Sequence, residues 1–124
     1  PIDAQLAAES HYWEGECHFS LRDYVNATGS YSKFSRAPGG YLSSYYPAAD
    51  YARGYALFKR KKYSDALSAF RSYLEAHLED APKRIHDAEL RTADCFYAKK
   101  EFDRAVSYYD RCLNRTTENK GSVD

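Results

Sequence analysis

Three side chains near the start of the chain are of types that bind metal ions. His11, Glu14 and His18 are spaced i, i+3 and i+7, so a helix would carry all three on one face. Two imidazoles and a carboxylate form a ligand set that zinc accepts. No HExxH sequence accompanies them. We predict that they form a polar surface or hydrogen-bond between helices, and an accessory or metal-binding helical domain of an enzyme system remains the alternative.

The chain has three cysteines, Cys17, Cys95 and Cys112. An odd number cannot form a closed set of disulfides, and the CxxC spacing of zinc and redox sites is absent. A catalytic thiol needs a partnered histidine, which no spacing here supplies. The sequence also lacks a GxSxG elbow and a Gly-rich phosphate loop. We therefore predict packing roles for the cysteines, and no catalytic residue, metal or cofactor.

Length and charge set further bounds on function. The 124 residues suit one domain. Basic and acidic residues balance at 18 each, so no global field attracts nucleic acid or an anionic membrane. No apolar run approaches the length of a membrane-spanning helix. We predict neither nucleic-acid binding nor membrane insertion. Because the first residue is Pro1 and not Met, we expect a processed chain or an excised fragment.

An internal repeat with a period of 39 residues runs through the chain. Its clearest markers are Tyr24, Tyr63 and Phe102, which are 39 residues apart. The same offset joins four further sets of like residues: Gly15, Gly54 and Ala93; Ala27, Ala66 and Ala105; Tyr31, Phe70 and Tyr109; and Phe19, Phe58 and Tyr97. A period of this length indicates a repeat architecture.

Apolar residues inside each copy follow the spacing of two helices joined by a turn. In the third copy, Leu90, Ala93 and Tyr97 stand at i, i+3 and i+7, and a second stripe begins at Ala105. Small residues in both helices allow their axes to approach closely. Links between copies are expected at 37–40 and around Pro82. We predict helices at 3–21, 24–36, 45–60, 63–79, 83–99 and 102–114.

These segments resemble the tetratricopeptide repeat. Trp13–Tyr24 and Ala93–Phe102 resemble its first helix and turn, and Ala66–Phe70 and Ala105–Tyr109 resemble its second helix. The likeness covers about residues 8–116 and looks closest to the long repeat proteins of Bacteroidetes-type bacteria. It implies an all-α fold, an α-solenoid of three helix–turn–helix units wound as a right-handed superhelix. The units would span 8–41, 47–80 and 86–119, with a polar tail at 115–124.

The resemblance also implies a function, that of a protein- or peptide-binding scaffold within a larger assembly. Partners of this family usually lie along the concave face, which the first helix of each unit lines. By position, that face would carry Tyr12, Glu16, Phe19, Tyr51, Tyr55, Phe58, Leu90, Asp94 and Tyr97. The Lys and Asn residues that clamp a terminal carboxylate in chaperone-binding members are absent. Glu16 and Asp94 favour a partner with basic residues.

Two interpretations of the aromatic residues remain open. Tyr12, Phe19, Tyr51 and Phe58 suit packing between units as well as binding. Tyr55 is the strongest candidate for binding, because the equivalent positions in the other units hold acids.

Polar residues stand at positions of the first helices where the family usually has large apolar ones. Glu14, Arg53 and Glu89 come from successive first helices, so we expect Arg53 to lie between two acids. Residues 114–124 are polar and should form a frayed tail, which would leave Tyr108, Tyr109 and Leu113 open. We expect self-association through such open ends or a longer natural protein. Family analogy favours a bacterial periplasm or cell envelope.

Overall fold

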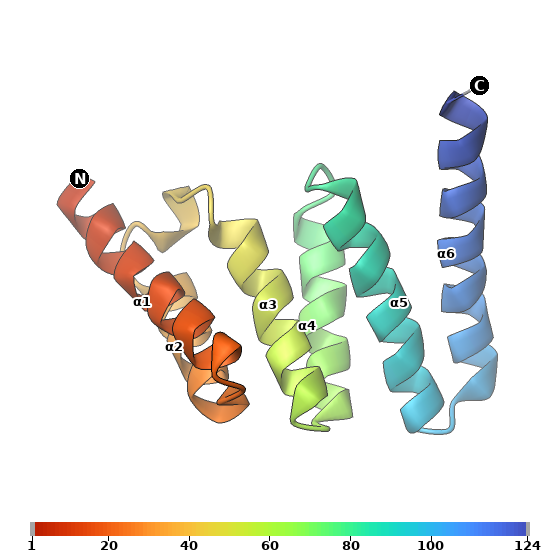
Figure 1. Ribbon diagram of the computed structural model, residues 1–124, viewed down its shortest axis with the longest axis horizontal. Helices are drawn as coiled ribbons and strands as arrows, with labels where there is room; N and C mark the ends of the chain where they lie inside the picture. Colours follow the sequence, from red (N-terminus) through yellow and green to blue (C-terminus); the bar gives the residue numbers. More distant parts are fainter. Residues whose placement is uncertain (1, 124) are drawn as a thin grey trace.

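The computed structural model describes the backbone of residues 2–123 and the side chains of residues 3–114. This part of the chain is all-helical and holds no strand. The elements in order are α1 (Ile2–Ser20), α2 (Tyr24–Arg36), the 3-10 turn η1 (Gly40–Leu42), α3 (Tyr46–Lys59), α4 (Tyr63–Ala76), α5 (Pro82–Ala98) and α6 (Phe102–Val123). The helices form three hairpins that follow one another along the longest axis of the molecule (Figure 1).

Contacts between elements are almost entirely between neighbours in the sequence. Each helix packs on the one before it and the one after it, and α3 also touches α5. Such nearest-neighbour stacking is the defining property of a helical-repeat solenoid. The fold class predicted from the repeat is therefore confirmed.

The turn inside each hairpin has the same backbone conformation in all three copies. Arg22, Lys61 and Lys100 stand one period apart and have φ values of 61°, 62° and 64°. After each of them the next amide closes the helix; the Asp23 N–H, for example, donates to the carbonyl oxygen of His18 at 2.8 Å. This is the Schellman helix ending, which places one residue in the left-handed region. The period seen in the side chains is thus repeated in the backbone.

Glycine lets the two helices of a hairpin approach closely. A Cβ added at Gly15 would lie 2.6 Å from Cε1 of Tyr31, and one added at Gly54 would lie 2.8 Å from Cδ1 of Phe70. The first two hairpins therefore close by seating an aromatic ring of the second helix over a glycine of the first.

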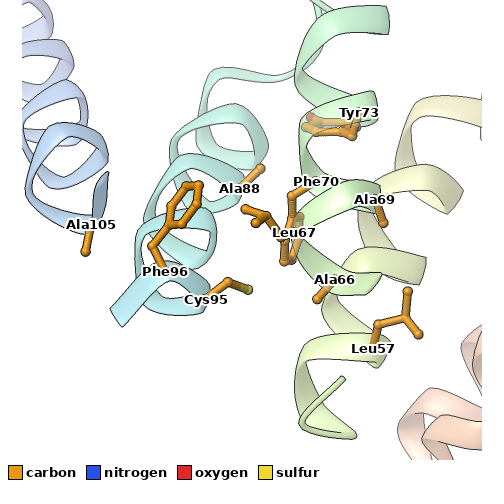
Figure 2. Close-up of a cluster of buried hydrophobic side chains, with 10 residues drawn as sticks. All are labelled: Leu57, Ala66, Leu67, Ala69, Phe70, Tyr73, Ala88, Cys95, Phe96 and Ala105. Carbon is orange, nitrogen blue, oxygen red and sulfur yellow. The ribbon is translucent and has the colours of Figure 1, made fainter. Parts of the chain in front are cut away.

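The core forms two clusters of buried side chains. One joins α1, α2 and α3 around Tyr31 and Phe34, and the other joins α3, α4, α5 and α6 around Phe70 and Phe96. Figure 2 shows Leu67 and Phe70 of α4 lying toward α5. Each cluster spans more than one hairpin, so the hairpins are held together by shared apolar packing.

Two expectations about the chain are corrected. The last helix was predicted to end at 114, yet α6 continues to Val123. The segment lacks an apolar stripe and is rich in residues of low helix propensity, but it contains no proline that would end a helix. Its side chains from 115 onward lie outside the described residues. The three-unit boundaries remain a prediction.

The second correction concerns Arg53. Within residues 3–114 it forms no ion pair, and Glu14 pairs instead with His11, at 2.8 Å. Arg53 lines a small hollow together with Ser32 and Ser35 of α2. Arg53 therefore lies near α2, the second helix of the preceding hairpin. The prediction had placed it between two acids of the neighbouring first helices.

Candidate functional site

A hollow of about 720 Å³ forms a groove between α1 and α3. Its walls come from the first helices of two successive hairpins. It is lined by Tyr12, Glu16, Phe19, Ser20, Arg22, Tyr24, Tyr31, Ala48, Tyr51, Ala52, Tyr55, Lys59 and Arg84. Ligand sites of proteins are concave and typically enclose about 300–1,000 Å³, so this groove has the size of a binding site.

The α1 wall is held in place by aromatic packing. Tyr12 is buried and stacks on Tyr45, with ring centroids 4.8 Å apart and planes only 9° from parallel. Trp13 meets the edges of both rings, at 5.1 and 5.3 Å. Phe19 packs edge-on against Tyr24 at 5.3 Å. Tyr12, Phe19 and Tyr24 pack in or against the core and also line the groove, so their packing does not remove them from its wall. Whether they bind a partner stays a prediction.

Tyr55 lies at the centre of the α3 wall and is half-buried. Its ring contacts Phe19 at 5.8 Å and Tyr51 at 6.0 Å, which ties α3 to α1. Two cations lie against the ring: Lys59 Nζ is 5.5 Å and Arg91 Cζ is 5.6 Å from its centroid. Such contacts attract the cations to the face of the ring. Tyr55 therefore lines the groove as a ring packed among Phe19, Tyr51 and two cations.

Both acids expected to attract a partner are engaged inside the fold. The Tyr31 hydroxyl donates to Glu16 at 2.8 Å. The Tyr109 hydroxyl donates to Asp94 at 2.6 Å, and Arg91 donates to the same carboxylate at 2.9 Å. Burial and the hydrogen bond to Glu16 raise the pKa of Tyr31, which keeps the hydroxyl protonated as a donor.

The charges left open on the groove are positive. Arg22 and Lys59 are exposed, and neither forms an ion pair with any described residue. Arg84 pairs with Asp80, to whose carboxylate it donates two hydrogen bonds of 3.0 Å. The groove therefore carries two cations without a carboxylate partner besides the carboxylate of Glu16, and the partner with basic residues that was expected from Glu16 and Asp94 stays a prediction.

Comparison with known families decides what kind of module carries this groove. A family model described as Tetratricopeptide repeat matches residues 51–119, more than half of the chain. The chain belongs to the tetratricopeptide repeat family. Tetratricopeptide repeats generally mediate protein–protein interactions and are typically non-catalytic. A comparison with curated proteins gives no significant match. Across the described residues, no helix is both long and apolar enough to cross a membrane.

The structure brings together five of the nine residues predicted for the concave face of this tetratricopeptide module. Tyr12, Glu16, Phe19, Tyr51 and Tyr55 line the groove, whereas Phe58, Leu90, Asp94 and Tyr97 do not.

The four that do not line it have other surroundings. Phe58 packs edge-on against Tyr63 at 5.8 Å. Leu90 and Asp94 are half-buried on α5. Tyr97 is 61% exposed and touches Phe102. Apart from Arg84, the groove residues therefore come from the first two hairpins, and the α5 residues of the predicted face stay outside it.

Sequence reasoning missed the residues that make the groove hollow and charged. Ala48 and Ala52 lie on the same stripe of α3 as Tyr51 and Tyr55, and their small side chains leave open space between the rings. That stripe was visible in the sequence as small residues alternating with tyrosines. Arg84 comes from α5, and no local pattern could assign it to a groove between α1 and α3.

The candidate metal ligands of α1 do not converge. His11 Nδ1 lies 2.8 Å from Glu14 Oε1, and His18 Nδ1 lies 3.6 Å from Asp23 Oδ2. Among the side chains that the structure describes, no three His, Cys, Asp or Glu residues gather as a metal site. None of the three cysteines forms a disulfide; Cys95 and Cys112 are buried in the packing, whereas Cys17 is exposed, so the packing role predicted for Cys17 is wrong.

Proposed function

We propose that this chain is a scaffold module whose groove between α1 and α3 binds a short segment of a partner protein. The observation that carries the proposal is the combination at one site of packed aromatic rings with cations that pair with no described carboxylate. Tyr55 and Phe19 offer apolar surface, and Arg22 and Lys59 offer positive charge, although Lys59 also lies over the Tyr55 ring. Rings held in place lose little entropy on binding, so they are suitable anchors for a peptide.

The positions of the charges indicate which end of the bound segment should be acidic. Arg22 follows the end of α1 and Lys59 is the last residue of α3, so both lie where the hairpins turn. The rings of Tyr51 and Tyr55 lie further along the groove toward the start of α3. A fitting segment carries an aromatic or aliphatic anchor between Tyr51 and Phe19, with acidic residues toward the turns.

Selection from a displayed library of random short peptides tests the proposal directly. Binders should be enriched in Asp and Glu beside an apolar residue, and their affinity should fall as salt rises. Tyr55→Ala should weaken binding by roughly 1–3 kcal/mol without loss of helicity. Lys59→Glu should weaken the acidic peptides more than neutral ones.

Matched controls separate the groove from the rest of the surface. Tyr97→Ala removes an exposed tyrosine outside the groove, and Lys33→Glu reverses an exposed charge on α2. Neither should change the affinity. If Tyr55→Ala leaves the affinity of the selected peptides unchanged, the groove is not their binding site. If the selected peptides are not enriched in acidic residues, the charge assignment is wrong.

A further inference from the structure

Charge is distributed unevenly over the molecule, although the chain as a whole is neutral. The segments that form and flank the three hairpin turns, 21–25, 59–65 and 99–104, contain eight basic and four acidic residues. The rest of the sequence carries the opposite excess. The three turns lie in a row along one edge of the molecule, and the links between hairpins lie along the opposite edge (Figure 1). These three segments therefore form a positively charged turn edge on a neutral chain.

Each turn holds a cation at the position where a helix ending favours glycine. Arg22, Lys61 and Lys100 have φ values of 61°, 62° and 64°, and all three are exposed. A residue with a Cβ is strained in this region, and glycine is the usual choice there. None of the three forms an ion pair with a described residue. Local stability therefore does not account for a cation at this position in every copy.

The acidic residues of the turn edge, by contrast, have roles inside the fold. Asp23 accepts a hydrogen bond from a backbone N–H at the start of α2, at 3.3 Å. Glu101 lies 3.5 Å from Nζ of Lys99. Asp65 and Asp103 lie in the first turns of α4 and α6, where a carboxylate stabilises the positive end of the helix. The cations at the left-handed position are thus the charges that stay available to an external anion.

Apolar side chains accompany the cations on the turn edge. Leu21 is 78% exposed and Val25 is 61% exposed. Ser64 and Asp103 stand one and two periods after Val25, and both are exposed as well. Because this position is exposed in the middle hairpin too, its exposure follows from the turn and not from the limits of the sequence. Lys and Arg beside exposed apolar side chains are the composition of segments that lie on anionic membranes.

We propose that the turn edge binds the surface of a membrane that contains anionic lipids. Lys61 and Lys100 lie against the headgroups, and Leu21 enters the headgroup layer, while no helix crosses the bilayer. At physiological salt a charge acts over about 8 Å, so the membrane responds to the edge that faces it and not to the net charge of the chain. The contact does not involve Tyr55 or Lys59, so it is independent of any peptide in the groove.

The aromatic residues of the turn edge favour lipid over single-stranded nucleic acid. Proteins that bind single strands stack bases on aromatic rings along a positive groove. Here Tyr24, Tyr63 and Phe102 each pack edge-on against another ring of the same hairpin. The most exposed apolar side chain of the edge is Leu21, which is aliphatic.

Cosedimentation of the full chain with lipid vesicles tests the proposal. Vesicles that mix phosphatidylcholine with phosphatidylserine should bind it, pure phosphatidylcholine vesicles should not, and added salt should weaken the binding. The double variant Lys61→Gly with Lys100→Gly should weaken binding by roughly 10- to 30-fold. Glycine suits the left-handed backbone at both positions, so the variant keeps its fold and the loss reports on charge alone.

A matched control and a second variant complete the design. Lys33→Gln with Arg71→Gln removes the same charge from exposed positions of α2 and α4 outside the turn edge, and it should leave binding unchanged. Leu21→Ser should weaken binding several-fold without altering its salt dependence. The proposal is overturned if the anionic vesicles do not bind the chain, or if the control weakens binding as much as the turn variant. It is equally overturned if Leu21→Ser changes nothing while single-stranded oligothymidine binds through the same lysines, since that result would assign the edge to nucleic acid.

Discussion

The Tyr31 hydroxyl donates a hydrogen bond of 2.8 Å to Glu16, fifteen residues earlier on the facing helix. The third hairpin repeats the pair as Tyr109 and Asp94, at 2.6 Å and the same separation. In the middle hairpin both members are replaced together, because the equivalent positions hold Phe70 and Tyr55. Because Phe70 has no hydroxyl, replacement of the acid by Tyr55 leaves no hydrogen-bond donor without its acceptor. Tyr55 instead places an aromatic ring on the groove.

Tyr31→Phe should lower the free energy of unfolding by about 1–2 kcal/mol, because a half-buried carboxylate loses its donor. Urea denaturation followed by circular dichroism measures the change. Tyr41→Phe is the matched control, since Tyr41 is 69% exposed and its loss should cost only a few tenths of a kcal/mol. Equal effects of the two substitutions would show that the Glu16 bond contributes nothing to stability.

Alkaline pH should destabilise the fold. Burial and the bond to Asp94 raise the pKa of Tyr109 to about 12, and burial raises the pKa of the Cys95 thiol to about 12. Unfolded tyrosine and cysteine release their protons near pH 10 and 8.5. The folded chain therefore binds more protons, and stability falls as pH rises from about 9 toward 12. Urea titrations at several pH values should show this fall, with a shallower slope in Tyr109→Phe. A stability independent of pH above 9 would contradict the prediction.

Gly54→Leu should destabilise the chain by about 2–3 kcal/mol, because even a Cβ there would lie 2.8 Å from the Phe70 ring. Gly29 provides the matched control in α2, since nothing lies within 4 Å of its added Cβ. Gly29→Ala should stabilise the helix by roughly 0.5–1 kcal/mol. Melting temperatures compare the two. An unchanged melting temperature for Gly54→Leu would mean that α3 and α4 can move apart without loss of stability.

Lys61→Gly should stabilise the chain by about 0.5–1 kcal/mol. Its φ of 62° strains a residue that has a Cβ, and glycine relieves that strain at some cost in unfolded-state entropy. Arg71→Gly, on the exposed side of α4, should instead cost about 1 kcal/mol. Chemical denaturation of both variants gives the comparison, and a destabilised Lys61→Gly would contradict the assigned turn strain.

The fold was largely predictable because its signals are local. The 39-residue period and the link prolines predicted all six helices, and five of the six agree with the structure to within three residues at each end. The end of α6 was missed because the prediction ended the helix where its apolar stripe stops, near 114, although no proline follows. The groove was only partly predictable. Position along a helix placed Tyr51 and Tyr55 on one face of α3, and both line the groove, but it could not show that Tyr31 donates a hydrogen bond to Glu16. A comparison of equivalent positions would have revealed this pair. Two copies of the repeat hold an acid together with a tyrosine, whereas the middle copy holds Tyr55 together with Phe70.

Stacking of each helix on its sequence neighbours has a kinetic consequence. Contacts that join nearby residues require only short loops to close, so folding should be fast for a chain of this length. The middle hairpin alone has a hairpin on either side, whereas α1 and α6 are each covered on one side only. Amide hydrogens of α3 and α4 should then exchange with solvent last, and opening should begin at the two ends and move inward.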